Sequence, residues 1–105
     1  SFDVASLPPC REIDILAHRY RISVEEMSVD ELGRCDTVIQ KISIRSDLLE
    51  DACRDTLLHE ICHAIAFHMS VDDPAPEELW VSRISTGLRT VLCSNPDLAA
   101  WIFDR

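Results

Sequence analysis

Hydrophobic and polar residues alternate along the first part of the chain in the pattern of half-buried β-strands. Ile13 and Ile15 alternate with polar neighbours, and the same spacing recurs at Tyr20, Ile22 and Val24. Side chains two residues apart point to the same face of a strand, so each set can cover a core from one side. The pattern therefore predicts two short strands in this region.

The clearest alternation lies in residues 37–45, from Thr37 to Arg45. One face of this stretch carries Val38, Gln40, Ile42 and Ile44, and the other carries Ile39, Lys41, Ser43 and Arg45. Gly33 is expected to form the turn that precedes this strand. We therefore expect a small antiparallel sheet of about three strands, with residues 37–45 as an edge strand.

After Asp47 the hydrophobic spacing changes to that of an α-helix. Asp47 and Glu50 are spaced like a capping arrangement at the start of a helix. The buried stripe predicted for this helix consists of Cys53, Leu57, Ile61, Ala64, Ile65 and Met69. The sequence His59-Glu60-Ile61-Cys62-His63 then lies in the middle of the helix.

Two further helices are expected in the C-terminal part. The stretch Val71-Asp72-Asp73-Pro74-Ala75-Pro76 should end the first helix, and an amphipathic helix should follow from Pro76 to Cys93. Asn95 as N-cap and Pro96 at the first helical position predict a short last helix through Trp101 and Phe103. The predicted fold class is α+β, with a small sheet packed on the motif helix and a second amphipathic helix.

The composition limits the classes of function. At 105 residues the chain is expected to be a single domain, 1–105. Its net charge of -9 opposes binding to nucleic acid or anionic lipid, and no apolar run approaches the ~20 residues that cross a bilayer. No secretory signal is evident at the N-terminus. We expect a soluble cytoplasmic protein with no nucleic-acid or membrane partner.

The cysteines support this compartment. They are odd in number and widely spaced, without any C-x-x-C pair, and comprise Cys10, Cys35, Cys53, Cys62 and Cys93. Neither a disulfide framework nor a zinc knuckle has this spacing. We interpret the cysteines as reduced thiols that act as small buried hydrophobic residues.

The segment from His59 to His63 carries the clearest chemical signal. The two histidines are four residues apart, so on a helix they share one face with Cβ atoms about 5–6 Å apart and can both reach one zinc ion. Glu60 lies about 100° around the helix from His59, close enough to hold a water molecule without binding the metal. Zinc lowers the pKa of such a water toward ~7, and Glu60 can then accept its proton and pass it to a leaving amine. The motif predicts one zinc ion (Zn²⁺) per chain and Glu60 as general base.

The motif also resembles a known family. Residues 56–65, Thr-Leu-Leu-His-Glu-Ile-Cys-His-Ala-Ile, follow residues 40–44, Gln-Lys-Ile-Ser-Ile, as in the small phage-type zincins and, more distantly, the ImmA/IrrE-type metallopeptidases. Residues 87–96 are similar to the helix end and Asn-Pro turn of the phage proteins. The resemblance implies a minimal gluzincin of bacterial or phage origin, acting in a bacterial or phage-infected cell, whose zinc is held by two histidines and a glutamate from the next helix. The chain is much shorter than the ImmA/IrrE proteins and has no helix-turn-helix, so repressor cleavage is not implied.

Two glutamates can provide the third zinc ligand. With about 100° per residue, Glu77 lies at the centre of the apolar face of the second helix, where a carboxylate is costly unless a cation compensates it. Glu78 lies at the edge of that face, at about 100°. The resemblance nevertheless favours Glu78, because the phage-type zincins have a glutamate three residues before the position equivalent to Val81. The two arguments disagree, and both residues stay candidates.

The remaining candidates have weaker support. His68 is about 140° around the helix from His63 and should point away from the metal, and His18 is interpreted as a surface histidine. Either Tyr20 or Arg83 can supply an oxyanion donor. Asp72 and Asp73 are interpreted as a solvated turn, with a carboxylate near the metal as the alternative. The large aromatic residues are assigned to the core rather than to a substrate pocket: Phe67, Trp80, Trp101 and Phe103.

These observations favour a zinc-dependent peptidase that acts on a peptide or protein substrate. The edge strand of residues 37–45 is expected to align an extended substrate by β-addition. The alternative is a zinc-stabilised interaction module with little or no catalytic activity. A metal-free α+β domain is the third hypothesis. Intact His59, Glu60 and His63 favour the first, because a pure binding module does not need the glutamate.

Overall fold

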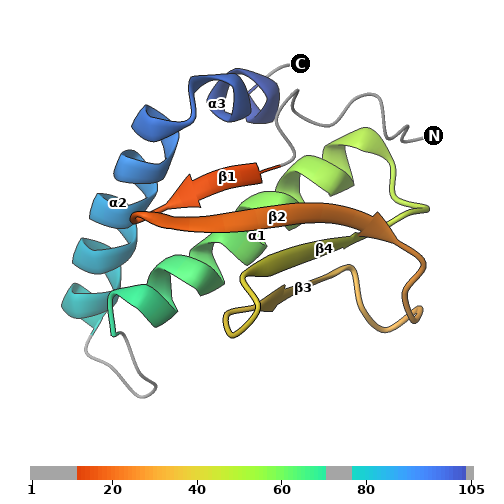
Figure 1. Cartoon of the computed structure of the whole chain (residues 1–105), viewed down its shortest axis with the longest axis horizontal. Coiled ribbons are helices and arrows are strands. Elements are labelled where there is room, and N and C mark those ends of the chain that lie inside the picture. Colours follow the sequence, from red (N-terminus) through yellow and green to blue (C-terminus); the bar gives the residue numbers. More distant parts are fainter. Residues whose placement is uncertain (1–11, 71–76, 104–105) are drawn as a thin grey trace.

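The structure, a computed structural model, describes the backbone of residues 12–70 and 77–103 and the side chains there except those of residues 77, 78, 81 and 82. The strands are β1 (Glu12–Ile15), β2 (His18–Glu25), β3 (Gly33–Asp36) and β4 (Lys41–Arg45). The helices are α1 (Glu50–His68), α2 (Glu77–Ser94) and α3 (Pro96–Ile102), so the predicted α+β class is confirmed (Figure 1).

The sheet differs from the predicted antiparallel sheet of three strands. It has four strands in the order β1-β2-β4-β3, and β2 and β4 run parallel. The chain leaves β2, forms β3 at the edge, turns, and returns as β4 between β2 and β3. Gly33 does not form a turn but begins β3, where it faces Ile44 of β4. The sequence Gly33-Arg34-Cys35-Asp36 has no hydrophobic alternation, so its strand is fixed by main-chain pairing.

The predicted strand at residues 37–45 is also shorter than expected and is not an edge. Residues 37–40 form a turn, in which Asp36 Oδ1 accepts hydrogen bonds from the main-chain nitrogens of Val38, at 3.0 Å, and Ile39, at 3.2 Å. Gln40 has a φ of 55°, which ends the alternation before β4 begins. Val38 and Ile39 are therefore exposed in a turn. A local aspartate turn overrides their preference for a strand.

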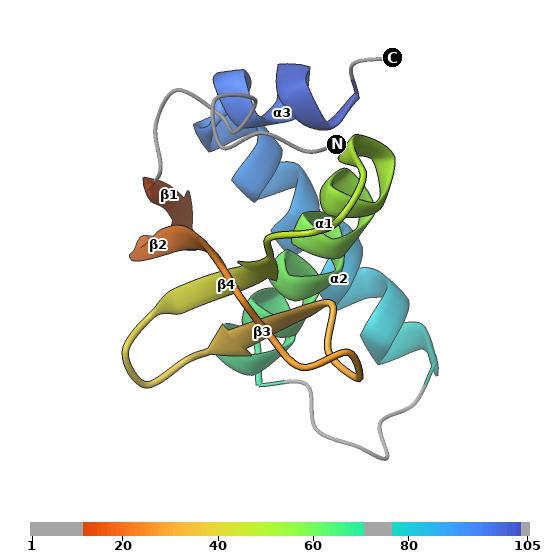
Figure 2. The ribbon, with the colours of Figure 1, turned by 90° about the vertical axis from the view of Figure 1, so that its right-hand side faces the viewer.

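All three helices lie on one side of the sheet (Figure 2). The core between these layers contains the predicted strand residues Ile13, Ile15, Tyr20, Ile22, Ile42 and Ile44. From α1 it receives Cys53, Leu57, Ile61, Ala64 and Ile65, while Met69 packs against it partly buried. The predicted stripe is thus confirmed, and it turns the opposite face of α1 outward.

The start of α1 does not have the predicted cap. Leu49 is the N-cap residue, and no side chain caps the helix. Asp47 instead accepts a hydrogen bond from Arg45 at 2.5 Å. The carboxylate of Asp47 therefore binds the guanidinium of Arg45 and does not cap the helix.

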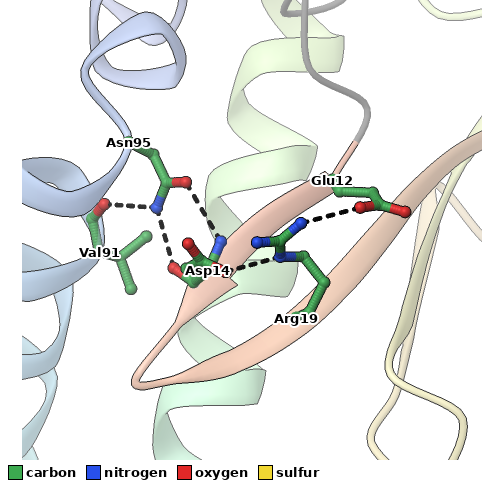
Figure 3. Close-up of polar contacts among 5 residues, drawn as sticks. All are labelled: Glu12, Asp14, Arg19, Val91 and Asn95. Carbon is green, nitrogen blue, oxygen red and sulfur yellow. Dashed lines mark hydrogen bonds and ion pairs between the residues drawn. The ribbon is translucent and has the colours of Figure 1, made fainter.

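The two C-terminal helices lie within one residue of their predicted limits. Pro96 begins α3 as expected, but the side chain of Asn95 makes no capping bond. Its amide instead donates to the main-chain oxygens of Asp14 and Val91 and accepts from Asp14 N (Figure 3). Asn95 therefore joins the end of α2 to the outer strand β1.

The prediction that four large aromatic residues lie in the core is correct for only part of the set. Trp101 packs against the core, whereas Phe67, Trp80 and Phe103 are exposed. Trp80 and Phe67 lie on helix faces turned away from the sheet, and Phe103 follows the end of α3. Within the described ranges, no helix is long and apolar enough to cross a membrane.

Candidate metal centre

His59 and His63 lie one turn apart on the exposed face of α1. Their Nε2 atoms are 3.0 Å apart, and their rings meet edge to face with centroids 4.7 Å apart. Two nitrogen donors of a tetrahedral zinc ion at 2.0–2.1 Å are about 3.3 Å from each other. The two imidazoles therefore fit a shared zinc ion after a displacement of only a few tenths of an ångström.

Glu60, next to these exposed histidines, is buried, with only 6% of its surface exposed. Burial raises the pKa of its carboxyl above the ordinary value, against the opposing effects of His63 and His59, and Glu31 raises it further. Among the described residues, no hydrogen bond or ion pair reaches this carboxylate. Glu60 thus has the environment expected of a general base.

Gly33 allows β3 to lie directly against α1 beside Glu60. A Cβ at this position would lie 2.7 Å from Thr56 Cγ2, 3.0 Å from Ser43 O and 3.2 Å from Glu60 Cγ. Any larger residue would push the strand away from the helix. The sequence signal was the glycine itself, which we interpreted as a turn.

A cleft of about 430 Å³ opens where β3 and the preceding loop meet α1. Its lining residues are Asp30, Glu31, Leu32, Gly33, Asp55, Thr56, His59 and Glu60. One metal-binding candidate and the candidate base therefore face the same cleft. Sequence reasoning missed Asp30, Glu31 and Asp55, because their proximity depends on where the loop packs.

The candidates for a third metal ligand lie outside the described side chains. Glu77 and Glu78 begin α2, but their side chains are not among those that the structure describes. Asp72 and Asp73 also lie outside the described ranges. Within those ranges, no group of three or more His, Cys, Asp or Glu side chains is arranged to hold a metal ion. Glu77 and Glu78 stay predictions.

The other candidate residues are not brought into this site. His68 Nε2 lies 2.6 Å from the Tyr20 hydroxyl, and the His68 ring stacks on that of His18 with centroids 3.8 Å apart. Burial, with Cys35 and Asp36 nearby, raises the pKa of Tyr20 to about 12. Neither Tyr20 nor Arg83, which donates to Met69 O, lines the cleft. The oxyanion donor stays a prediction.

The described cysteines differ in their exposure. Cys53 is buried, Cys35 and Cys62 are half-buried, and Cys93 is exposed, contrary to the expectation that each would be buried. Burial raises the pKa of Cys35 and of Cys53 to about 11. Thiols with such pKa values stay protonated near neutral pH, so they are poor nucleophiles. Cys10 lies outside the described residues.

In comparisons with protein-family models, curated proteins and solved structures, no match was found for this chain. The function is therefore inferred from the chemistry of these residues and the geometry around them.

Proposed function

We propose that the protein is a zinc-dependent peptidase of the small phage-type zincin kind, in which His59 and His63 hold one zinc ion and Glu60 is the general base. The observation that carries the proposal is the pair of Nε2 atoms 3.0 Å apart on the helix turn that also bears Glu60. Glu60 and His59 both face the cleft, so substrate and base can meet there.

The proposed chemical role of each residue follows from its environment. When bound, zinc supplies the Lewis acidity that makes water a nucleophile at neutral pH. The carboxylate of Glu60 is buried and lacks a partner among the described residues, so it is free to accept a proton from the attacking water. The same group can then deliver the proton to the departing amine. Because α1 is packed into the core, it keeps these side chains at a fixed spacing.

The substrate is proposed to bind along β3. This strand is at the edge of the sheet, next to the cleft, so an extended peptide can pair with its outer side. β3 takes the role that we had assigned to residues 37–45. The third ligand is proposed to be Glu77 or Glu78, which begin the helix after the motif helix. We place the enzyme in the cytoplasm of a bacterial or phage-infected cell.

The test is a peptide-library cleavage assay of the wild type and the Glu60→Gln variant, with zinc content measured in both. Glu60→Gln should retain zinc and lower the cleavage rate by a factor of about 10²–10⁴, because proton transfer to the base is lost. Asp51→Asn is a matched control, since Asp51 is an exposed carboxylate on the same helix. It should cleave like the wild type.

Two outcomes would count against this proposal. Equal cleavage by the wild type and Glu60→Gln would exclude Glu60 as the base. Zinc binding without cleavage of any peptide in the library would favour the zinc-stabilised interaction module instead.

A further inference from the structure

We infer that the cleft beside His59 and Glu60 accepts a positively charged side chain, so that the substrates are peptides with lysine or arginine near the scissile bond. This inference rests on the proposed peptidase function and adds its substrate class.

The charge of the cleft is one-sided. Among the described residues, four carboxylates line it, those of Asp30, Glu31, Asp55 and Glu60, and no lysine or arginine does. Glu31 is paired with Arg34 at 2.6 Å on the surface. In the described part of the chain, Asp30 and Asp55 have no ion pair. Their charges therefore stay available to a ligand.

Glu60 gives a second and separate indication of a ligand. Its side chain is more than nine-tenths buried, faces the cleft, and accepts no hydrogen bond from the described residues. A buried carboxylate without partners is costly, and a nearby cation reduces that cost. A cationic side chain entering the cleft would supply this compensation while Asp30 and Asp55 hold it.

Hydrogen bonds from Arg45 fix the loop that carries Asp30. Arg45 Nη1 donates to the main-chain oxygens of Val29, at 3.1 Å, and Glu31, at 3.3 Å, and its main-chain nitrogen donates to Leu32 O at 2.9 Å. The loop that carries Asp30 is thus fastened to β4 by one arginine. Such preorganised charges bind a ligand with less loss of entropy than mobile surface groups do.

Asp30 and Asp55, which have no ion pair among the described residues, line the cleft from different elements. Asp55 lies on α1, one turn before His59, and Asp30 lies on the loop before β3. Leu32, about half exposed, also lines the cleft and adds an apolar surface to it. A lysine or arginine combines an apolar stem with a charged end, so it matches both features. The net charge of -9 adds long-range attraction for a cationic peptide.

The experiment measures binding separately from cleavage. Zinc-supplemented wild-type protein, which keeps Glu60, is titrated by fluorescence anisotropy with short labelled peptides that carry a non-cleavable ketomethylene bond and differ only in a central lysine, glutamine or glutamate. We expect the lysine peptide to bind about tenfold more tightly than the glutamine peptide. Adding Asp30→Asn and Asp55→Asn should remove this preference. The control pair Asp51→Asn and Asp97→Asn removes the same number of charges from residues that do not line the cleft. This pair should preserve the lysine preference.

The outcomes separate this inference from the peptidase proposal. Equal binding of the lysine and glutamine peptides, no binding of the lysine peptide, or an equal effect of the control pair would overturn the basic specificity. If the wild type cleaves peptides without a basic preference, the specificity is wrong and the peptidase proposal stands. If the lysine preference depends on Asp30 and Asp55 but nothing is cleaved, the cation-binding cleft stands and the peptidase proposal fails.

Discussion

His59, Glu60 and His63 are close in sequence but occupy different environments. A helix turns by about 100° per residue, so the histidines share an exposed face while Glu60 points toward β3. Gly33 makes this arrangement possible, because it has no side chain to push the strand away from Glu60. An exposed pair of imidazoles beside a buried carboxylate is the arrangement that the proposed metal-assisted hydrolysis requires.

The proposed third ligand gives a prediction about Glu77 and Glu78. Catalytic zinc sites usually have three protein ligands, so loss of the true third ligand should lower zinc affinity by about 10–100-fold or more. We expect either Glu77→Ala or Glu78→Ala to show this loss, and the other variant to bind zinc like the wild type. Competition with a fluorescent zinc chelator measures both affinities. Normal affinity in both variants would rule out the gluzincin assignment.

The contact between β2 and the end of α1 should make stability depend on pH. His68 lies against Tyr20 and His18, and burial, together with the charge of His18, lowers the pKa of His68 below the ordinary 6.5. The unfolded chain therefore binds the proton of His68 more readily than the folded chain does. This contribution to stability is present above pH ~6.5 and is lost as the pH falls below that value.

The variant His68→Gln tests this contact. It should lose about 1 kcal/mol of stability at pH 7.5 from the Tyr20 hydrogen bond and should lose less on acidification than the wild type. Urea unfolding between pH 5 and 7.5, with a chelator present, gives the difference at each pH. Parallel pH profiles for the two proteins would show that His68 does not carry the effect.

At the scale of the whole molecule, the two edge strands of the sheet have different contacts. At the β1 edge, Asn95 pairs with the main-chain nitrogen and oxygen of Asp14 and links that strand to α2 (Figure 3). At the other edge, no described strand pairs with the outer side of β3, and the cleft opens beside it. An unpaired edge is open to a further strand, so of the two edges among the described residues that of β3 suits the proposed peptide binding better.

How much of this could be predicted depended on whether the signal was local. The motif helix and the stripe from Cys53 to Ile65 follow from a repeat within a few residues, and both were confirmed. The strand β3 and the parallel pairing of β2 with β4 depend on partners that no local pattern specifies. Asn95 was expected to cap its own helix but bonds to Asp14, 81 residues away.

The site shows the same division. His59, Glu60 and His63 could be selected as candidates because their spacing on a helix is itself the chemical signal. Asp30 and Asp55 line one cleft because the loop before β3, which Arg45 fastens to β4, packs near α1. Neither residue belongs to a motif, so sequence reasoning could not select them.

The central claim is that His59 and His63 together bind one zinc ion, and native mass spectrometry of the intact chain tests it most directly. Protein purified with zinc present should carry one zinc ion per chain. His59→Ala and His63→Ala should each lose it, because a single imidazole leaves too few ligands. His18→Ala, which changes a histidine outside the site, should retain it. A wild type without zinc, or equal zinc content in the wild type and both site variants, would contradict the claim.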